Sequence, residues 1–194
     1  AMRMLKAQGL IDVKHGKGMY VTLSQTEAFT DALITSLRRD NASAWDVEQF
    51  EQLLLPQIIA LASTEATDNE IQNIKSSADI YLKSYEEMIN QEEFADEKHL
   101  RELQKKSKTT FVNYMRSIFE STHNKLIMLL GDVLINLRKW RTVSDVEEIL
   151  PKMVNLEKVI INMYVKAIET RNSEKASKMV QTGINYDSSM VSIM

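Results

Sequence analysis

The residues best suited to bind a charged ligand lie near the N-terminus of this chain. Lys14, His15 and Lys17 stand in the segment KHGKG, whose two glycines allow the positive φ angles of a tight turn. Arg3 adds another cation a few residues earlier. Cationic side chains at an exposed tip neutralise phosphate charge, so these four residues indicate contact with a nucleic-acid backbone. From composition alone, the alternative is a surface hairpin with chance charges.

The other reactive side chains do not form a recognisable catalytic or metal-binding set. The sequence has three histidines and no cysteine, which leaves no disulfide framework, cysteine metal site or cysteine nucleophile in these residues. His99 has Asp96 and Glu102 about one helical turn away, a spacing that a metal ion can use, although such faces are more often simply solvated. His123, beside Asn124, has the place of a helix cap or turn residue. No nucleophile is paired with a base and an orienting group, so we expect neither enzymatic activity nor a cofactor.

The cationic tip needs a β-hairpin to present it. Leu10–Val13 and Met19–Thr22 are short runs rich in β-forming residues on either side of the tip. The expected cross-strand neighbours are Ile11 and Val13 on one strand and Met19 and Val21 on the other. Ala1–Gln8 has the spacing of a helix that ends at Gly9, but no capping residue precedes it. The chain is therefore expected to start part-way through a helix.

The rest of the sequence favours helix throughout. It has only five glycines and two prolines, and apolar residues recur every three or four positions. This spacing predicts helices over 29–37, 47–61 with a kink at Pro56, 71–88, 94–119 as one helix or two, 126–137, 146–168 and 176–184. Helix starts are predicted by capping pairs at Ser24 and Glu27, Thr67 and Glu70, Asn90 and Glu93, and Ser144 and Glu147. Leu126–Leu137 is apolar on nearly all sides and is predicted to be the buried central helix.

Composition limits the class of protein. The 194 residues are 44% apolar, enough for one buried core and part of another. The net charge is −3, so the overall charge gives no indication of nucleic-acid binding. In a two-domain regulator, however, an acidic sensor domain would outweigh the positive charge of a small DNA-binding domain. No apolar run reaches the length of a membrane span and no signal peptide is visible, so we expect a cytoplasmic protein that does not bind membranes.

The N-terminal segment AMRMLKAQGLIDVKHGKGMYVT resembles the end of the winged-helix DNA-binding domain of GntR-family regulators. In that family a recognition helix of pattern R-E-A-L-R-x-L-x-x-x-G-L-I runs into a hairpin, the wing, of pattern G-x-G-x-[FY]-V. The matching positions are Ala1, Met2, Arg3, Leu5, Gly9, Leu10, Ile11, Gly16, Gly18, Tyr20 and Val21. The resemblance covers about 22 residues. It implies that the first part of the domain precedes Ala1.

The helical region resembles the ligand-binding domain of the FadR branch of that family, often called the FCD domain. Three segments carry the resemblance, in the family's order: LLLPQIIALASTEAT, YMRSIFESTHN and AIETRNSEKASKM. They begin at Leu53, Tyr114 and Ala167, and the resemblance spans roughly 46–184. It implies a helical domain that binds a small-molecule effector.

The same resemblance implies a site without a metal ion. Many members hold a divalent metal with one Asp and three His, and these positions fall here at Phe111, Met115, Ile161 and Gly183. None of these residues can bind a hard or borderline cation, because they offer a thioether or no side-chain donor at all. A family Arg that meets anionic effectors falls at Glu51, beside Gln52, which puts a simple carboxylate effector in doubt.

The sequence therefore predicts an all-α protein, a six- or seven-helix bundle preceded by the C-terminal remnant of a winged helix. Its expected parts are the winged-helix end at 1–23, a linker helix at 24–45 and an effector-binding and dimerisation domain at 46–194. The predicted function is transcriptional regulation by a homodimer that binds operator DNA through Arg3, Lys14, His15 and Lys17. The effector residues are Phe111, Met115, Ile161, Gly183 and Gln52, and the metal-free prototype of the branch makes long-chain acyl-CoA the natural candidate. The alternatives are a metal-dependent, carboxylate-sensing regulator of the same family, and an all-helical enzyme or scaffold unrelated to DNA.

Overall fold

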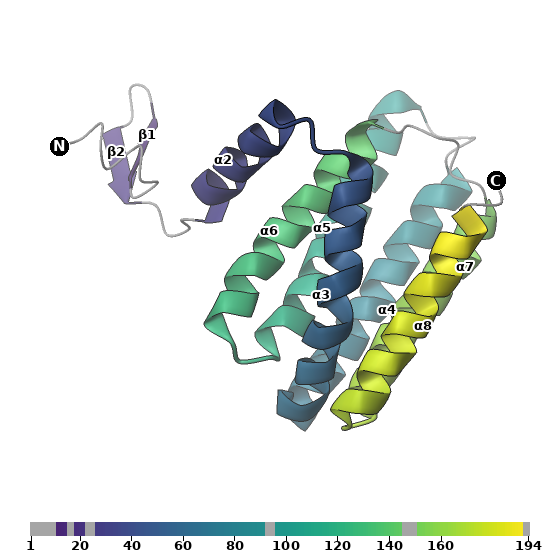
Figure 1. Cartoon of the computed structure of the whole chain (residues 1–194). Helices are drawn as coiled ribbons and strands as arrows, with labels where there is room; N and C mark the ends of the chain where they lie inside the picture. Colours follow the sequence, from purple (N-terminus) through teal and green to yellow (C-terminus); the bar gives the residue numbers. More distant parts are fainter. Residues whose placement is uncertain (1–10, 15–17, 22–25, 92–95, 145–150, 192–194) are drawn as a thin grey trace.

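The computed structural model describes residues 11–14, 18–21, 26–91, 96–144 and 151–191. Their arrangement is a small β-hairpin followed by a helical bundle (Figure 1). The helices are α2 (Thr26–Arg39), α3 (Ala44–Glu65), α4 (Asp68–Gln91), α5 (Glu97–Glu120), α6 (Lys125–Ser144), α7 (Pro151–Glu169) and α8 (Ser173–Val191). The described part of the chain thus has seven helices, which confirms the predicted all-α bundle.

The hairpin has the predicted register. Strands β1 (Ile11–Lys14) and β2 (Gly18–Val21) are antiparallel, with Ile11 opposite Val21 and Val13 opposite Met19. Each strand differs from the predicted range by one residue at its ends. The predicted helix at Ala1–Gln8 and the capping pair at Ser24 lie outside the described residues.

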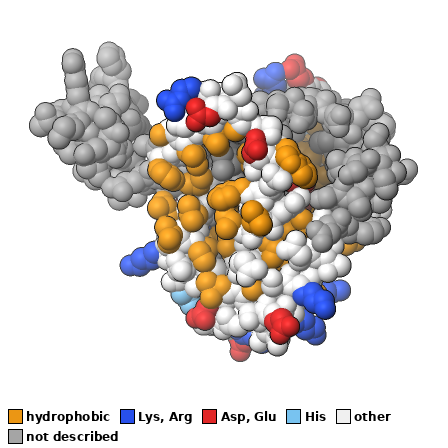
Figure 2. All heavy atoms as spheres, viewed as in Figure 1, with side chains coloured by type: hydrophobic (Ala, Val, Ile, Leu, Met, Phe, Trp, Pro, Cys, Tyr) orange, Lys and Arg blue, Asp and Glu red, His pale blue; other side chains and the backbone are white. Residues whose placement is uncertain are grey.

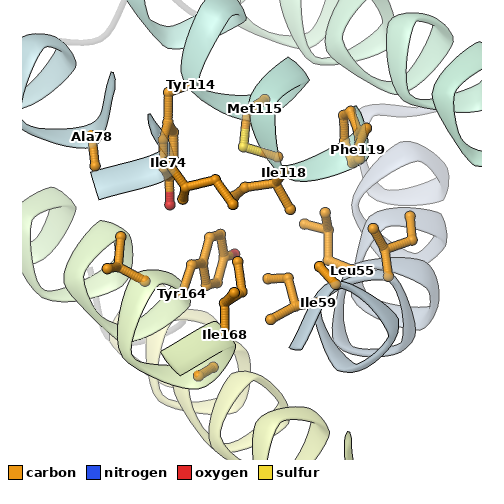
Figure 3. Packing of buried hydrophobic residues seen from close by; sticks show 14 of the residues in the cluster. Leu55, Ile59, Ile74, Ala78, Tyr114, Met115, Ile118, Phe119, Tyr164 and Ile168 are labelled. Carbon is orange, nitrogen blue, oxygen red and sulfur yellow. The ribbon is translucent and has the colours of Figure 1, made fainter. Parts of the chain in front are cut away.

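The bundle closes around one main apolar core contributed by α3 to α8. Tyr114, Ile118 and Phe119 of α5 face Ile59 of α3 and Ile168 of α7, and all five side chains are almost completely buried (Figure 3). Their three-to-four spacing places each set on one side of its helix, which is the pattern that predicted these helices. Burial of such side chains is the main stabilising contribution to the bundle.

Helices α4 and α5 approach each other closely along a polar seam. The hydroxyls of Ser77 and Ser117 are 3.1 Å apart, and those of Ser84 and Thr110 are 2.6 Å apart. In each pair one hydroxyl can donate across the seam, and its partner can donate to a backbone carbonyl of its own helix, since all four hydroxyls lie within hydrogen-bond distance of such a carbonyl. Small side chains let the two backbones come close, and these hydrogen bonds satisfy the buried hydroxyls.

A second, smaller core attaches α2 to the bundle. Val47 at the start of α3 and Val133 of α6 are buried against Leu33, Ile34 and Leu37 of α2. Figure 1 shows α2 beside α6, between the hairpin and the other helices. Helix α2 therefore packs mainly against α6 and the start of α3.

Helix starts were only partly predictable. The capping pair of Thr67 and Glu70 is confirmed: the Glu70 carboxylate accepts from the Thr67 amide at 2.8 Å. The prediction at Asn90 is wrong, because Asn90 lies inside α4 and α5 starts after the capping residue Asp96. The pair that caps α3, Ser43 and Asp46, was not predicted, because it has Asp where the predicted pairs have Glu.

Four other predictions concern where the helices run and how they are buried. Residues 97–120 form one continuous helix rather than two. Helix α3 passes through Pro56 as a single helix. Ser144 ends α6 rather than capping a later helix, and the predicted helix start at residue 146 lies outside the described residues, which resume with α7 at Pro151. The prediction that Leu126–Leu137 is the buried central helix holds only for its second half: Val133, Leu134 and Ile135 are buried, whereas Leu126 and Leu129 are 63% and 40% exposed.

Non-glycine residues make the turns between several helices. Asn41, His123 and Arg171 follow α2, α5 and α7 with φ of 57°, 52° and 51°. This left-handed conformation at a helix end usually belongs to glycine. The side chain of Arg171 donates to the Ala66 carbonyl and to the carboxylate of Asp68, so it joins the α7–α8 turn to the α3–α4 turn.

Candidate functional site

A small cavity lies where α3, α5 and α6 meet. Its volume is about 10 Å³, room for roughly one water molecule. Of the described residues, those that line it are Glu51, Leu55, Phe111, Met115, Phe119, Leu134 and Ile135. Two of the predicted effector residues, Phe111 and Met115, therefore lie together in the wall of one cavity.

Helical spacing explains why these side chains converge. Phe111, Met115 and Phe119 succeed one another every four residues on α5, so they form one stripe. Glu51 and Leu55 do the same on α3. Figure 3 shows Leu55, Met115 and Phe119 labelled in the same region of the core. The cavity is a gap in the packing where these two stripes meet Leu134 and Ile135 of α6.

Glu51 is the one charged side chain among the described residues that line the cavity. Its exposed fraction is 8%, and the six other lining residues are apolar. A carboxylate in an apolar wall repels a second anion at short range, because the interaction is poorly screened there. The cavity is therefore unsuited to hold a carboxylate effector next to Glu51, in line with the departure noted at this position in the sequence.

The structure places the other predicted effector residues elsewhere. Ile161 is 1% exposed and lies in the main core, where its carbonyl accepts from the Tyr114 hydroxyl at 3.4 Å. Gln52 donates to Glu48 at 3.2 Å on the same helix and does not line the cavity. Gly183 packs against Met163, whose sulfur would lie 2.1 Å from an added Cβ. The gap that the missing Gly183 side chain was expected to leave is thus filled by the side chain of Met163.

The described residues offer no group of three His, Cys, Asp or Glu side chains that could hold a metal ion. His99 lies on an exposed side of α5, and its Nδ1 is 4.0 Å from Oε2 of Glu102. The positions aligned with the family's metal ligands carry the apolar side chains of Phe111, Met115 and Ile161, and Gly183. These residues do not fit a divalent metal, because none supplies an oxygen or imidazole donor.

His123 contributes to a local polar network near the start of α4. Its Nε2 lies 2.9 Å from Oε1 of Glu70. Hydrogen bonds from the amide and hydroxyl of Thr67, followed by that of His123, lower the pKa of Glu70 to about 2. This network caps α4 and holds the α5–α6 turn against it, so we assign it a structural role.

A second depression lies on the outer side of the bundle, between α3 and α8. Its volume is about 470 Å³, and residues such as Gln57, Ser177 and Gln181 give it a polar lining. It is wide and open, whereas specific ligand sites bury most of the ligand among apolar walls. The α3–α5–α6 cavity, with its mostly apolar lining, is therefore the better candidate site.

Helix α6 both lines the cavity and packs against α2. Leu134 and Ile135 line the cavity, while the preceding residue, Val133, is buried against α2. A shift of α6 would therefore change the cavity and the position of α2 together.

The predicted DNA-contacting residues belong to the hairpin region. Lys14 ends β1 and lies opposite Gly18 at the closed end of the hairpin, next to the turn. Arg3, His15 and Lys17 lie outside the described residues.

Comparison with known proteins places this arrangement in a fold class. No protein-family model matches the sequence, and no curated protein matches it either. None of the helices within the described ranges combines the length and apolar character needed to cross a membrane. The described part of the chain shares its fold with a solved bacterial structure.

That structure is described as Streptococcus agalactiae GntR. The match has a TM-score of 0.61, an identity of 17%, and covers 94% of this chain and 75% of that one. At this identity the likeness shows a shared fold.

Proposed function

We propose that this chain belongs to a GntR-family transcriptional regulator whose helical domain senses a small molecule. The observation that carries the proposal is the shared fold with Streptococcus agalactiae GntR over 94% of the chain. The hairpin with its predicted register supports it independently, because it follows the sequence pattern that resembles the family's wing.

The DNA-binding half of the proposal rests on the hairpin tip. Arg3, Lys14, His15 and Lys17 would contact phosphates or the minor groove, the helix end from the major-groove side and the wing beside it. A homodimer would place two such heads on a palindromic operator, with half-sites separated by about 34 Å per helical turn.

The sensing half rests on the cavity between α3, α5 and α6. In the FadR-branch reading, Phe111 and Met115 replace metal ligands, so the effector would be held by apolar contact and not through a cation. The cavity in its present form, about 10 Å³, is too small for an acyl chain such as that of long-chain acyl-CoA. An apolar effector would have to displace side chains, and the flexible Met115 is the one best able to move.

The response would pass through α6. An effector that enlarges the cavity would press on Leu134 and Ile135, and the displaced helix would carry Val133 and the attached α2 with it. Helix α2 precedes α3 and follows the hairpin, so its position influences where the DNA-binding head lies. Effector binding would then favour one of two arrangements of the heads, a population shift.

The competing readings find less support. A metal-dependent sensor needs donors that the aligned positions lack, and an enzyme needs a reactive set that the described residues do not show.

The first experiment measures DNA binding by the full-length protein. After selection of an operator, fluorescence anisotropy is followed as a function of salt for the wild type and for Lys14→Ala with Lys17→Ala. Loss of two phosphate contacts should weaken binding and reduce the salt slope by up to about two units. Lys105→Ala with Lys108→Ala removes the same charge from exposed positions on α5 and should leave the slope unchanged. An unchanged slope in the hairpin variant would remove the wing from the DNA, and absence of any specific binding would refute the function.

The second experiment identifies the effector. Native mass spectrometry of the purified protein should find an apolar small molecule and no stoichiometric metal. Zinc, nickel or manganese at one ion per chain would contradict the metal-free site.

A further inference from the structure

Glu51 differs from the other acidic residues of the bundle in its burial. Of the Asp and Glu side chains that the structure describes, it alone is buried, with 8% of the residue exposed. On the same helix, Asp46 caps the N-terminus and Glu48 accepts from Gln52, so both have evident structural roles. Burial of a carboxylate away from water is costly. A buried carboxylate that borders a cavity is therefore a candidate for ligand recognition.

The surroundings of this carboxylate are aromatic and aliphatic. Phe111 and Phe119 border the same cavity, and Met115 lies between them on one stripe of α5. The face of an aromatic ring attracts a cation. Figure 2 shows hydrophobic side chains gathered over the face that α3 and α6 form, with charged side chains mostly toward its rim. An apolar ligand body therefore has apolar surroundings both in the cavity and on the adjoining surface.

We propose that the effector of this cavity is an amine with an apolar body, whose ammonium group binds at Glu51. The inference rests on the proposed function and deepens it by naming the chemical class of the effector. The space already present, about 10 Å³, holds roughly one water molecule, and an ammonium group is of similar size. The apolar body would then lie along the stripe of α5 once the flexible Met115 turns aside.

A cationic head group gains more from Glu51 than a neutral one. The cost of burying the carboxylate is met when the chain folds, so binding of an ammonium group does not have to meet it again. The attraction is weakly screened, because the other lining residues are apolar. Glu51 already interacts with another group of the protein. A carboxylate nevertheless offers about four acceptor positions, so it can accept a further N–H donor.

The open depression between α3 and α8 does not offer the same selection. Glu174 and Lys178 place charges of both signs in its lining, and both residues are exposed. Water screens such charges, so a single ammonium group gains little there. Selection for a cation is therefore expected at Glu51 and not at this depression.

The test compares three six-carbon probes that differ only in their head groups: hexylammonium, 1-hexanol and hexanoate. Isothermal titration calorimetry at pH 7 measures their binding to the full-length protein. The wild type should bind hexylammonium at least about tenfold more tightly than 1-hexanol, because a hydrogen bond to a charged group is stronger than a neutral one. It should bind hexanoate more weakly than either. Glu51→Gln keeps the shape of the side chain, removes its charge, and should abolish the preference for hexylammonium over 1-hexanol.

Glu48→Gln is the matched control. Glu48 lies three residues before Glu51 on α3 and carries the same charge, but it is not among the described residues that line the cavity. This variant should keep the full preference for hexylammonium. The methionine methyl signals in NMR spectra report the location: hexylammonium should shift that of Met115 and leave that of Met163, which packs against Gly183, unchanged. Circular dichroism of both variants checks that the helices persist.

Each other outcome overturns the proposal. Equal affinity for hexylammonium and 1-hexanol, tighter binding of hexanoate, or no binding of any probe refutes a cationic effector and leaves the proposed regulator standing. A preference that survives Glu51→Gln, or a shift at Met163 without one at Met115, places the ammonium group elsewhere. Should Glu51→Gln fail to fold, the three probes and the Met115 signal decide in the wild type alone. The titration contains no DNA, so a protein that prefers hexylammonium but binds no operator would count against the proposed function and leave the amine site intact.

Discussion

The two mid-helix glycines offer a sharp test of how the core is packed. Gly131 of α6 and Gly183 of α8 both become Ala. In each helix the substitution should gain about 1 kcal/mol of unfolding free energy, because alanine loses less backbone entropy than glycine. The intrinsic gain is the same, so any difference between the variants reports on the neighbours of the added methyl group.

Those neighbours differ in their freedom to move. A Cβ at Gly131 would lie 2.2 Å from Cδ2 and 2.5 Å from Cγ of Phe119, a ring that is 1% exposed. The ring must shift within a close-packed core, and overpacking of this kind costs about 1–3 kcal/mol. At Gly183 the clashing atoms are the terminal Sδ and Cε of Met163, at 2.1 and 2.4 Å, on a half-buried and flexible side chain. Met163 can turn away at small cost.

We therefore expect Gly131→Ala to lower the unfolding free energy by about 1 kcal/mol net and Gly183→Ala to leave it unchanged or slightly raised. Urea unfolding followed by circular dichroism measures both, with the slope of the free energy against urea checked for two-state behaviour. Two variants that shift equally, in either direction, would refute the reasoning, since they would show that the contacts of Phe119 and Met163 do not decide the outcome.

Two further predictions concern the capping networks. Glu70 has its pKa lowered to about 2, so its ionised form stabilises the fold fully above the unfolded value near 4.5 and loses this effect as the pH falls toward 2. The melting temperature of the wild type should accordingly exceed that of Glu70→Gln at pH 6, with the gap narrowing below about pH 4.5 and closing only as the pH approaches 2, whereas a gap independent of pH would contradict the assignment. Ser43→Ala removes the hydroxyl that caps α3 and should cost about 1 kcal/mol in urea unfolding. The exposed mid-helix hydroxyl of Ser76, which bonds only to its own helix, serves as the comparison, and a Ser76→Ala variant that loses as much would argue against a capping effect.

The sequence predicted which segments form helices and strands better than it predicted where those helices and strands begin and end. Alternation and paired glycines predicted the hairpin register, because cross-strand pairing and turn chemistry are local properties. Apolar spacing predicted the helices for the same reason. Asn90 failed as a cap because packing carries α4 on to Gln91, and a local motif cannot show where tertiary contacts extend a helix.

Exposure was harder to predict than helicity. An all-round apolar α6 was expected to be buried, yet Leu126 and Leu129 are open, since apolar content alone does not reveal which neighbours cover a helix. The candidate site shows the same limit. Phe111 and Met115 share one helix stripe and line the cavity together, whereas Ile161 and Gly183 depended on long-range alignment and lie elsewhere. Leu134 and Ile135 gave no signal distinguishing them from other core residues.

The α4–α5 seam divides the bundle into parts of unequal stiffness. Close backbone approach, with hydroxyls bonded across the pair at 2.6 and 3.1 Å, gives these two helices little room to slide. Helix α2, by contrast, is held mainly by a few aliphatic side chains on α6 and the start of α3. Local opening should thus begin at the α2–α6 edge, while α4 and α5 act as a fixed frame. A molecule built in this way can transmit a signal by rearranging one edge while the rest of its core keeps its packing.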